Sequence, residues 1–258
     1  MQYNNDPIKI FEETMDFFKN NEGELSLNEA CECIALAPET VDGINLPEKT
    51  GPCNIEVTRN DSFGAALGMG EGCLVLNFMS GWNPGGGVTK GARAQEEDLC
   101  RRSSLYLSLT SEEGMQLYSY NRENAPDMSS NYMLLSPKVE IIKTSDGEYI
   151  EPSMTCAVLS AAAPRLIGEF GFNVDDDELE QVLQSRIHGI LQVAAKYGYR
   201  RLILGAWGCG AYRNDPEQVS RIFRDELNRM TGYFDDVEFA VYGKSENYEC
   251  FLEAFGKA

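Results

Sequence analysis

Short apolar segments alternate with helix-like segments along most of the chain, and this alternation restricts the fold more than any other feature. Strand-like runs occur at 54–58, 73–78 and 201–206, whereas the apolar spacing over 175–197 follows the period of an α-helix. Alternating strands and helices favour a central sheet that is covered by helices on both faces. The sequence therefore predicts an α/β protein with three layers, α/β/α, around a mixed central sheet.

The expected elements follow from this pattern, and the length of 258 residues suits one large domain. Asp6 and Pro7 are typical of an N-cap and a first helical position. Residues 38–53 are expected to form a connection. Residues 1–52 are predicted to form a helical extension of a single domain over 1–258. The remaining predicted strands are 133–135, 139–144, 154–160 and 237–242, and the predicted helices are 26–36, 61–67, 94–109, 112–121, 175–197, 216–230 and 246–255.

Charge and histidine content exclude several classes of function. The chain has 41 acidic and 22 basic residues, a net charge of −19. Because binding to nucleic acid needs clustered Lys and Arg, a basic nucleic-acid-binding surface is not expected. The one histidine, His188, excludes sites that need two imidazoles and is expected at a surface or boundary position. The eight cysteines are scattered, which favours buried free thiols over a disulfide framework, and no metal site is predicted.

The N-terminal residues carry neither the positive region nor the apolar region of a signal peptide. No run approaches the roughly 18 apolar residues that span a membrane. We therefore expect a cytoplasmic protein without a membrane partner.

Two glycine-rich loops follow predicted strands. Residues 77–87 come directly after one strand, and residues 205–216 come after another and end in Asn214-Asp215-Pro216, an N-cap arrangement. Ligands of open α/β sheets bind outside the carboxyl ends of strands, where glycines let the backbone approach them closely. Either loop alone could be a tight turn, and neither has Walker A or dinucleotide-fingerprint spacing. Together the loops suit a pyrophosphate that is held by backbone N–H groups.

Gln95-Glu96-Glu97 begins a predicted helix seven residues after Gly85-Gly86-Gly87. A carboxylate beside an anion-binding loop is suited to general acid–base catalysis. Adjacent residues on a helix diverge by about 100°, so only one of the two glutamates is expected to work on a given bond.

A simpler interpretation of this helix is also open. Glu97 with Arg101, and Asp98 with Arg102, have the i,i+4 spacing of ion pairs on a solvated helix face. Acidic residues in a first turn are also favoured by the helix dipole. Residue types alone favour this interpretation slightly over a catalytic one.

The triple glycine, the seven-residue spacer and the Gln-Glu-Glu triplet together resemble the signature of poly(ADP-ribose) glycohydrolases. Residues 77–106 are similar to the shorter, microbial type of that family, and residues 204–216 resemble its second phosphate loop. The two motifs stand about 110 residues apart and in the family's order, and the resemblance covers most of the chain. It implies a macrodomain-like fold, in agreement with the order of strands and helices.

The resemblance also implies roles for individual residues. Glu97 would be the catalytic acid/base, and Glu96 would orient the ribose hydroxyls. Tyr212, at a position where the family commonly has Phe, would stack near the adenosine or the ribose. The ligand-binding set would be completed by Asn83, Gly85, Gly86, Gly87 and Gln95 near the ribose and a phosphate, and by Gly208, Cys209, Gly210 and Ala211 along the diphosphate.

The implied activity is hydrolysis of ribose–ribose O-glycosidic bonds, with release of ADP-ribose from chain ends and no cofactor. The substrate would be poly(ADP-ribose) or another ADP-ribosylated macromolecule, cleaved through an oxocarbenium-like state with a carboxylic acid as proton donor. Two alternatives stay open at this point. One is a macrodomain module that binds ADP-ribose without cleaving it, and the other is a glycohydrolase that acts on mono-ADP-ribosylated targets.

Three further residues have open roles. Arg165 follows Pro164 where the microbial enzymes usually have Asn, so it could alter substrate preference. Trp82 and Trp207 each lie inside a glycine loop, where they could pack beneath the loop or border the ligand.

Overall fold

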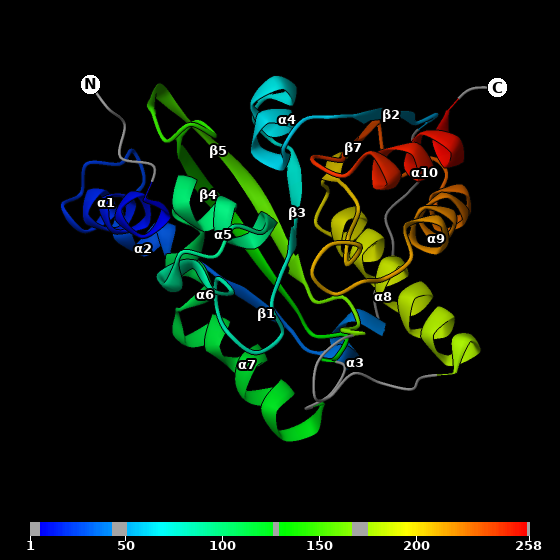
Figure 1. Ribbon diagram of the computed structural model, residues 1–258. Helices are drawn as coiled ribbons and strands as arrows, with labels where there is room; N and C mark the ends of the chain where they lie inside the picture. The colour runs from blue at the N-terminus through cyan, green and yellow to red at the C-terminus, as the bar shows by residue number, and fades with distance from the viewer. Residues whose placement is uncertain (1–5, 43–50, 126–128, 167–174, 257–258) are drawn as a thin grey trace.

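A computed structural model of the chain describes residues 6–42, 51–125, 129–166 and 175–256. Within these segments the strands form one seven-stranded sheet of order β1-β4-β5-β3-β6-β7-β2 (Figure 1). The strands are β1 (Ile34–Leu36), β2 (Asn54–Thr58), β3 (Leu74–Phe78), β4 (Met133–Lys143), β5 (Tyr149–Ala161), β6 (Arg201–Leu204) and β7 (Asp236–Ala240).

The sheet is mixed. Strands β5, β3, β6, β7 and β2 run parallel to one another, and β3 pairs with β5 from Leu74–Ala157 to Phe78–Ala161. The pairs β1–β4 and β4–β5 are antiparallel. The predicted mixed central sheet is therefore confirmed.

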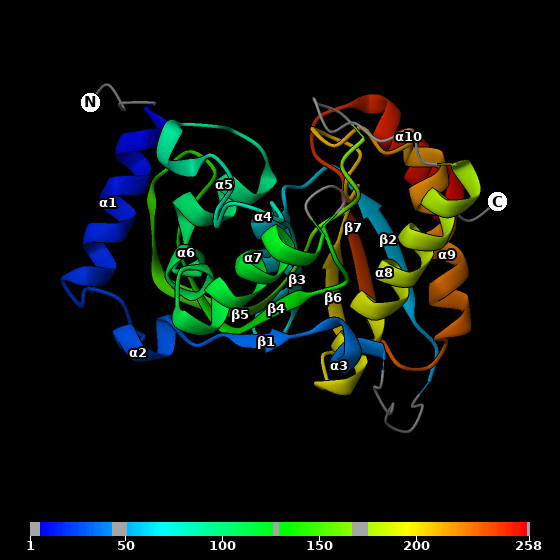
Figure 2. The ribbon, with the colours of Figure 1, turned by 90° about the horizontal axis from the view of Figure 1, so that it is seen from below.

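Helices cover both faces of the sheet, as Figure 2 shows. They are α1 (Pro7–Lys19), α2 (Leu27–Ala30), α3 (Pro38–Asp42), α4 (Ser62–Met69), α5 (Gln95–Arg102), α6 (Leu105–Leu109), α7 (Glu112–Asn124), α8 (Asp176–Lys196), α9 (Pro216–Arg229) and α10 (Ser245–Phe255), with a 3₁₀ helix η1 (Val88–Lys90). Figure 2 shows α1, α5, α6 and α7 on one side and α8 and α9 on the other. The predicted three-layer α/β/α arrangement is confirmed.

Alternation along β3 separates the two cores. Leu74 and Leu76 pack into the cluster that includes α8 and α9, whereas Cys73 and Val75 pack into the cluster that includes α5 and α7. Successive side chains of a strand point to opposite faces, so one continuous apolar run supplies both cores.

Several helix starts agree with the sequence prediction. Asp6 caps α1, accepting a hydrogen bond from the N–H of Ile8 at 3.0 Å, and Pro7 is the first helical residue. Asp215 caps α9 in the same way, with Pro216 following it. Each cap satisfies a backbone N–H that the helix itself cannot pair.

The predicted N-terminal helical extension contains helices α1, α2 and α3 but also a strand. The expected helix 26–36 ends after α2 at Ala30, and Ile34–Leu36 instead forms β1, the edge strand that pairs with β4. Hydrogen bonding to β4 outweighs the weak helical preference of this short segment. The predicted connection 38–53 contains the short helix α3, and residues 1–5 and 43–50 lie outside the described residues.

Two other predicted boundaries were wrong. The expected strands 133–135 and 139–144 are one strand, β4, with a register shift between Ser136 and Val139. Pro137, which has no N–H to donate to a ladder, lies at this irregularity. The expected helix 94–109 is two helices, because Ser103 adopts an extended conformation between them.

Surface and thiol predictions can also be compared with the structure. The side chain of His188 is 40% exposed on α8, and its Nδ1 lies 2.8 Å from Glu226 Oε2, which confirms a boundary position. All eight cysteines are free, with Cys31, Cys53 and Cys250 only partly buried. Across the described segments, no helix has the length and apolar character needed to cross a membrane. The same segments contain no group of three or more His, Cys, Asp or Glu that could hold a metal ion.

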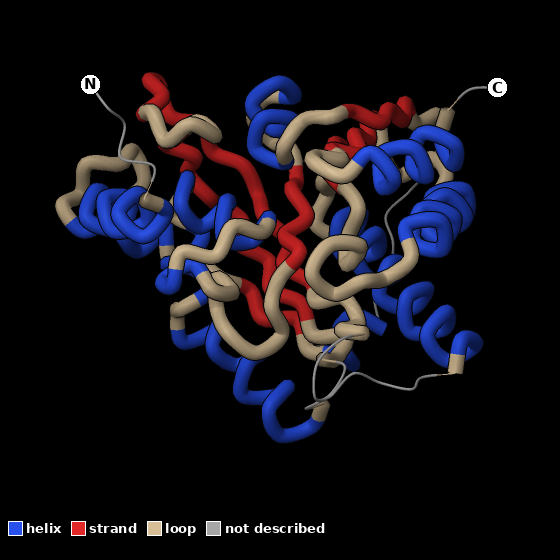
Figure 3. The backbone as a smooth tube through the Cα atoms, in the orientation of Figure 1, coloured by secondary structure: helices blue, strands red, loops and turns tan. Residues whose placement is uncertain are grey.

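The parallel strands β3 and β6 are neighbours, so their carboxyl ends lie at the same edge of the sheet. The loops that leave these ends are drawn in tan in Figure 3, and both line one cavity. The fold therefore brings together the two glycine loops that are more than 100 residues apart in the chain.

Candidate active site

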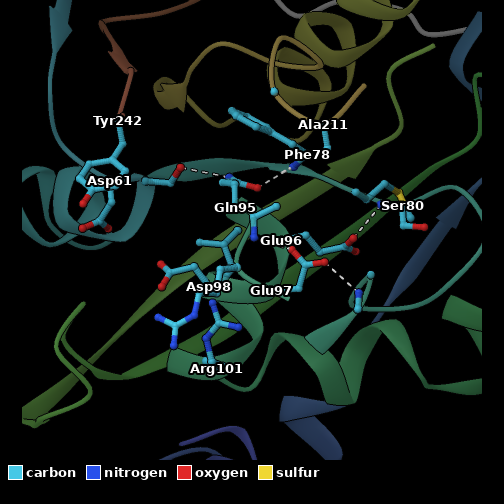
Figure 4. A pocket seen from close by; sticks show the side chains of 18 of the residues that line it. Asp61, Phe78, Ser80, Gln95, Glu96, Glu97, Asp98, Arg101, Ala211 and Tyr242 are labelled. Atoms are coloured by element: carbon cyan, nitrogen blue, oxygen red, sulfur yellow. Dashed lines mark hydrogen bonds between the residues drawn. The ribbon is translucent and has the colours of Figure 1, made fainter. Parts of the chain in front are cut away.

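A cavity of about 1140 Å³ lies at the carboxyl edge of the sheet. Its wall contains parts of both glycine loops, the first turns of α5 and the ends of β3 and β7. Figure 4 shows the side chains of α5 that project into it. This is the position at which open α/β sheets bind ligands.

Backbone conformation in the first loop requires glycine at two positions. Gly85 has φ of +66° and Gly86 has φ of +59°, in the left-handed region. A Cβ at Gly85 would lie 2.7 Å from the ring of Tyr106, and a Cβ at Gly86 would lie 3.1 Å from Glu96 Oε2 and closer still to Glu97 Oε1. The absence of a side chain at Gly86 therefore leaves room for both carboxylates.

Gln95 fastens the start of α5 to the end of β3. Its Oε1 accepts a hydrogen bond from the N–H of Phe78 at 2.9 Å, and its Nε2 donates to the carbonyl of Leu76 at 2.9 Å. The amide also donates to Ser62 Oγ. Gln95 borders the cavity, but its polar atoms are engaged with the protein, so its position suits holding α5 in place.

Glu96 is 4% exposed, and its Oε2 accepts a hydrogen bond from the N–H of Ser80 at 2.7 Å. Its Oε1 is buried and has no hydrogen-bond partner among the described residues. Burial raises the pKa of the Glu96 carboxyl well above its ordinary value, and the charge of Glu97 raises it further. The Ser80 N–H opposes this effect but does not outweigh it.

Glu97 is 7% exposed, and both of its oxygens accept backbone hydrogen bonds. The N–H of Gly87 donates to Oε1 at 2.8 Å, and the N–H of Ala94 donates to Oε2 at 3.0 Å. The second bond pairs a free amide at the start of α5, while the first ties the helix to the glycine loop. The carboxylate is thus held in one orientation at the cavity wall.

The expectation that the two glutamates diverge was wrong. Figure 4 shows the carboxyl groups of Glu96 and Glu97 on the same side of α5, directed toward the glycine loop. Backbone amides of Ser80 and Gly87 draw the two side chains together at the first helical turn. Backbone spacing on the helix fixes where the Cα atoms lie, but not where long side chains end.

The alternative interpretation of α5 as a solvated face was also wrong. Arg102 is 2% exposed, and its Nη1 donates to Asp61 at 2.6 Å and to Asp98 at 2.8 Å. The Asp98–Arg102 pair exists, but it is packed against β4, because Arg102 Nε also donates to the carbonyl of Lys143. Glu97 forms no ion pair with Arg101 among the described residues, and both glutamates are buried.

The second loop also contains a glycine in the left-handed region. Gly208 has φ of +78°, and a Cβ there would lie 2.6 Å from Asn214 Nδ2. Asn214 Nδ2 donates to the carbonyls of Pro164, at 2.8 Å, and Gly208, at 3.1 Å. Gly208, Gly210 and Ala211 line the cavity, which leaves their backbone close to a ligand.

Two residues of the expected binding set do not border the cavity with their own atoms. Cys209 is 4% exposed, its side chain belongs to the core on the α8 and α9 side, and burial raises the pKa of its thiol. Gly85 is buried against the ring of Tyr106. Both residues pack on the inner side of their loops, away from the cavity.

Tyr212 reaches from the second loop toward the first. Its hydroxyl faces Ser80 and Gly81, close to Glu96, and burial raises the pKa of this phenol to about 12. The nearby charge of Glu96 acts in the same direction. The ring lines the cavity, so Tyr212 lies beside the carboxyl groups.

The structure also places the residues whose roles were open. Trp207 is fully buried and donates from Nε1 to the carbonyl of Ala161 at 2.9 Å, so it packs beneath its loop. Trp82, Asn83 and Arg165 line the cavity, and Asn83 and Arg165 are exposed.

Other cavity residues were not found by sequence reasoning. Ser80 holds Glu96 through its N–H, and Tyr242 is 76% exposed at the end of β7. An aromatic residue just beyond a predicted parallel strand is a signal that could have identified Tyr242. No sequence signal distinguishes a backbone N–H such as that of Ser80.

Comparison with known proteins identifies the family. The model of the microbial-type PARG catalytic domain matches residues 14–144, about half of the chain. The chain belongs to this family. A solved PARG, the poly(ADP-ribose) glycohydrolase from Thermomonospora curvata, is 30% identical, with 96% of this chain and 99% of that chain covered and a TM-score of 0.85.

Two further PARG structures contain ligands. The Thermomonospora curvata enzyme bound to the inhibitor ADP-HPD is 29% identical, covers 96% of this chain and 99% of its own, and has a TM-score of 0.83. The Deinococcus radiodurans PARG in complex with ADP-ribose is 32% identical, covers 88% of this chain and 96% of its own, and has a TM-score of 0.78. No curated protein matches the chain.

Proposed function

We propose that this protein is a poly(ADP-ribose) glycohydrolase that hydrolyses ribose–ribose O-glycosidic bonds and releases ADP-ribose from chain ends. The observation that carries the proposal is the pair of buried carboxyl groups, Glu96 and Glu97, between a glycine loop and a large cavity. Membership of the PARG family supports the activity, and the relatives bound to ADP-ribose and ADP-HPD support ADP-ribose as the ligand.

The glycine loops would hold the phosphates and the terminal ribose. Backbone N–H groups can approach an anion closely where a side chain is absent, and they bind it without a basic surface. Gly208, Gly210 and Ala211 would contact the diphosphate, with Cys209 shaping the turn. Asn83, Gly86 and Gly87 would lie beside the ribose and the nearer phosphate.

Glu97 would be the general acid and base. As an acid it would transfer a proton to the oxygen of the leaving ribose while the bond to the anomeric carbon breaks. As a base it would then take a proton from the water that attacks that carbon, which restores its starting state. Its two backbone hydrogen bonds fix the carboxyl group before the substrate arrives.

Glu96 would bind the substrate and leave the proton transfer to Glu97. Among the described residues the buried oxygen Oε1 has no hydrogen-bond partner, so a ribose hydroxyl could pair with it. Burial raises the pKa of the Glu96 carboxyl, which disfavours two negative charges side by side at this site. Tyr212 would pack against the same ribose, since its ring lies close to Glu96. Gln95 would keep α5 in register with β3.

The site needs no cofactor for this reaction, since the acid, the base and the anion-binding groups are all supplied by the chain. We further propose that residues 1–258 act as one domain in the cytoplasm. A single sheet that joins β1 to β7 supports one domain, and eight free cysteines support a reducing compartment.

The proposal is tested by incubating the purified protein with poly(ADP-ribose) and, separately, with mono-ADP-ribosylated protein, and measuring free ADP-ribose. Rapid release from the polymer alone is expected. Release only from the mono-ADP-ribosylated protein would reassign the substrate. Binding of ADP-ribose without release from either substrate would identify a binding module and refute the proposal.

A further inference from the structure

Arg101 is a buried cation in the cavity wall that forms no ion pair with the residues that the structure describes. It lies on α5 one turn after Glu97, is 7% exposed, and is part of the cavity wall. Its Nη1 donates to the carbonyl of Ala92 at 2.6 Å. No ion pair found within the described segments includes Arg101, because Asp98 in the same turn pairs with Arg102. A buried charge is costly unless it is paired, so this guanidinium calls for an anion from outside the chain.

Two further basic residues line the same cavity. Lys90 ends η1, and Arg93 lies in the segment between η1 and α5. Burial lowers the pKa of the Arg101 guanidinium and the positive charge of Arg93 acts in the same direction, whereas the charges of Asp98 and Glu97 oppose them. Bringing like charges close together costs electrostatic free energy, and a bound anion would offset this cost. In a chain of net charge −19, this basic group is distinctive.

The acidic residues of this part of the cavity form no ion pair with Arg101 within the described segments. Asp61 and Asp98 both accept hydrogen bonds from Arg102 Nη1, at 2.6 and 2.8 Å. Asp146 is exposed to solvent at the cavity rim. Among the described residues, the Arg101 guanidinium therefore donates to a backbone carbonyl but forms no ion pair.

Arg101 and the second glycine loop lie on opposite sides of the carboxyl groups. In Figure 4, Ala211 is on one side of Glu96 and Glu97, and Arg101 is on the other. If the second loop holds the diphosphate of the unit that is released, Arg101 faces the part of the polymer beyond the scissile bond. In poly(ADP-ribose) the leaving ribose carries its own diphosphate at the 5′ carbon, a few bonds from the leaving oxygen.

We propose that Arg101, with Arg93 and Lys90, forms a second anion subsite that binds the diphosphate of the ADP-ribose unit on the leaving side of the bond. The inference rests on the proposed function and adds to it the recognition of a neighbouring unit. Guanidinium groups suit this role because they bind phosphate oxygens through two parallel hydrogen bonds. The subsite would favour polymer over a single ADP-ribose linked to a group without phosphate.

The test compares two substrates that differ on the leaving side. One is poly(ADP-ribose), and the other is ADP-ribose joined through its 1″ carbon to a fluorogenic phenol that carries no phosphate. For each protein, the ratio of kcat/KM on the polymer to kcat/KM on the phenol substrate is measured. Arg101→Gln is expected to lower this ratio about tenfold, and the double variant Lys90→Gln/Arg93→Gln several-fold. Lys196→Gln, an exposed charge change on α8, is the matched control.

A ratio that stays at the wild-type value in all these variants would overturn the subsite, even if both activities fall together. If Arg101→Gln does not fold, the exposed double variant still decides the question. Raising the salt concentration should lower the ratio for the wild type more steeply than for the variants.

Failure of the proposed function gives a different result. If the wild type cleaves neither substrate, the activity is wrong, and the subsite is then tested by binding alone. The affinity for polymer relative to ADP-ribose should still fall in the double variant, and an unchanged relative affinity would refute the subsite.

Discussion

Substitution of Gly86 by Ala should abolish most activity through the two carboxyl groups and not through the fold. The residue has φ of +59°, where an L-residue with a Cβ is strained by about 1–2 kcal/mol. The added methyl would also lie 3.1 Å from Glu96 Oε2 and closer to Glu97 Oε1, so both side chains must move. A displacement of about 1 Å at a reacting group costs on the order of 100-fold in rate. We expect kcat on poly(ADP-ribose) to fall about 100-fold.

A matched variant separates the two effects. Gly198, between α8 and β6, has φ of +79°, and a Cβ there would meet nothing within 4 Å. Gly198→Ala therefore introduces the same backbone strain without touching the site. Both variants should lose about 1–2 kcal/mol of unfolding free energy in urea, but only Gly86→Ala should lose activity. Equal kcat values for the two variants would refute the argument that glycine is needed at position 86 to make room for the carboxyl groups.

Two further predictions concern charge. The pKa of Glu96 is raised in the folded state, whereas in the unfolded chain the carboxyl loses its proton above a pH of about 4.3. Between these two pKa values the native protein binds a proton that the unfolded chain does not bind. The contribution of Glu96 to the free energy of unfolding therefore becomes less favourable as the pH rises through this range. Relative to the wild type, Glu96→Gln should therefore gain unfolding free energy in urea titrations as the pH rises above about 5, whereas the exposed control Glu112→Gln should not. A pH-independent difference would contradict the burial argument. ADP-ribose affinity, measured by calorimetry, should depend only weakly on salt if backbone amides hold its phosphates, and a steep fall between about 50 and 200 mM salt would indicate basic side chains instead.

Local sequence signals predicted the strands, helix starts and glycine loops that surround the site. The apolar run of β3 predicts a buried strand, and Asp6 and Asp215 predict the starts of two helices. These features depend on residues that are close together in the sequence, so they can be predicted without tertiary contacts. The glycine loops were located for the same reason, since each follows a strand directly. The mixed sheet and the three layers were recovered in this way.

Long-range contacts account for what the sequence did not predict. β1 exists because β4 supplies its hydrogen-bond partner, about 100 residues later in the chain. Glu96 and Glu97 converge because amides of another loop bind them, against the divergence that a helix alone implies. Arg102 is buried by contact with Asp61, and its spacing from Asp98 gave no sign of this. Each of these three errors concerned a partner on another element of the chain.

The central claim is that Glu97 transfers the proton in a site that binds ADP-ribose through its loops. The most direct test measures two quantities for Glu97→Gln and for the wild type, namely the rate of ADP-ribose release from poly(ADP-ribose) and the affinity for free ADP-ribose. The amide keeps the shape of the carboxyl group but cannot exchange the proton, so we expect release to fall by roughly 10²–10⁴-fold while affinity changes little. Release at the wild-type rate from the Glu97→Gln protein would contradict the account.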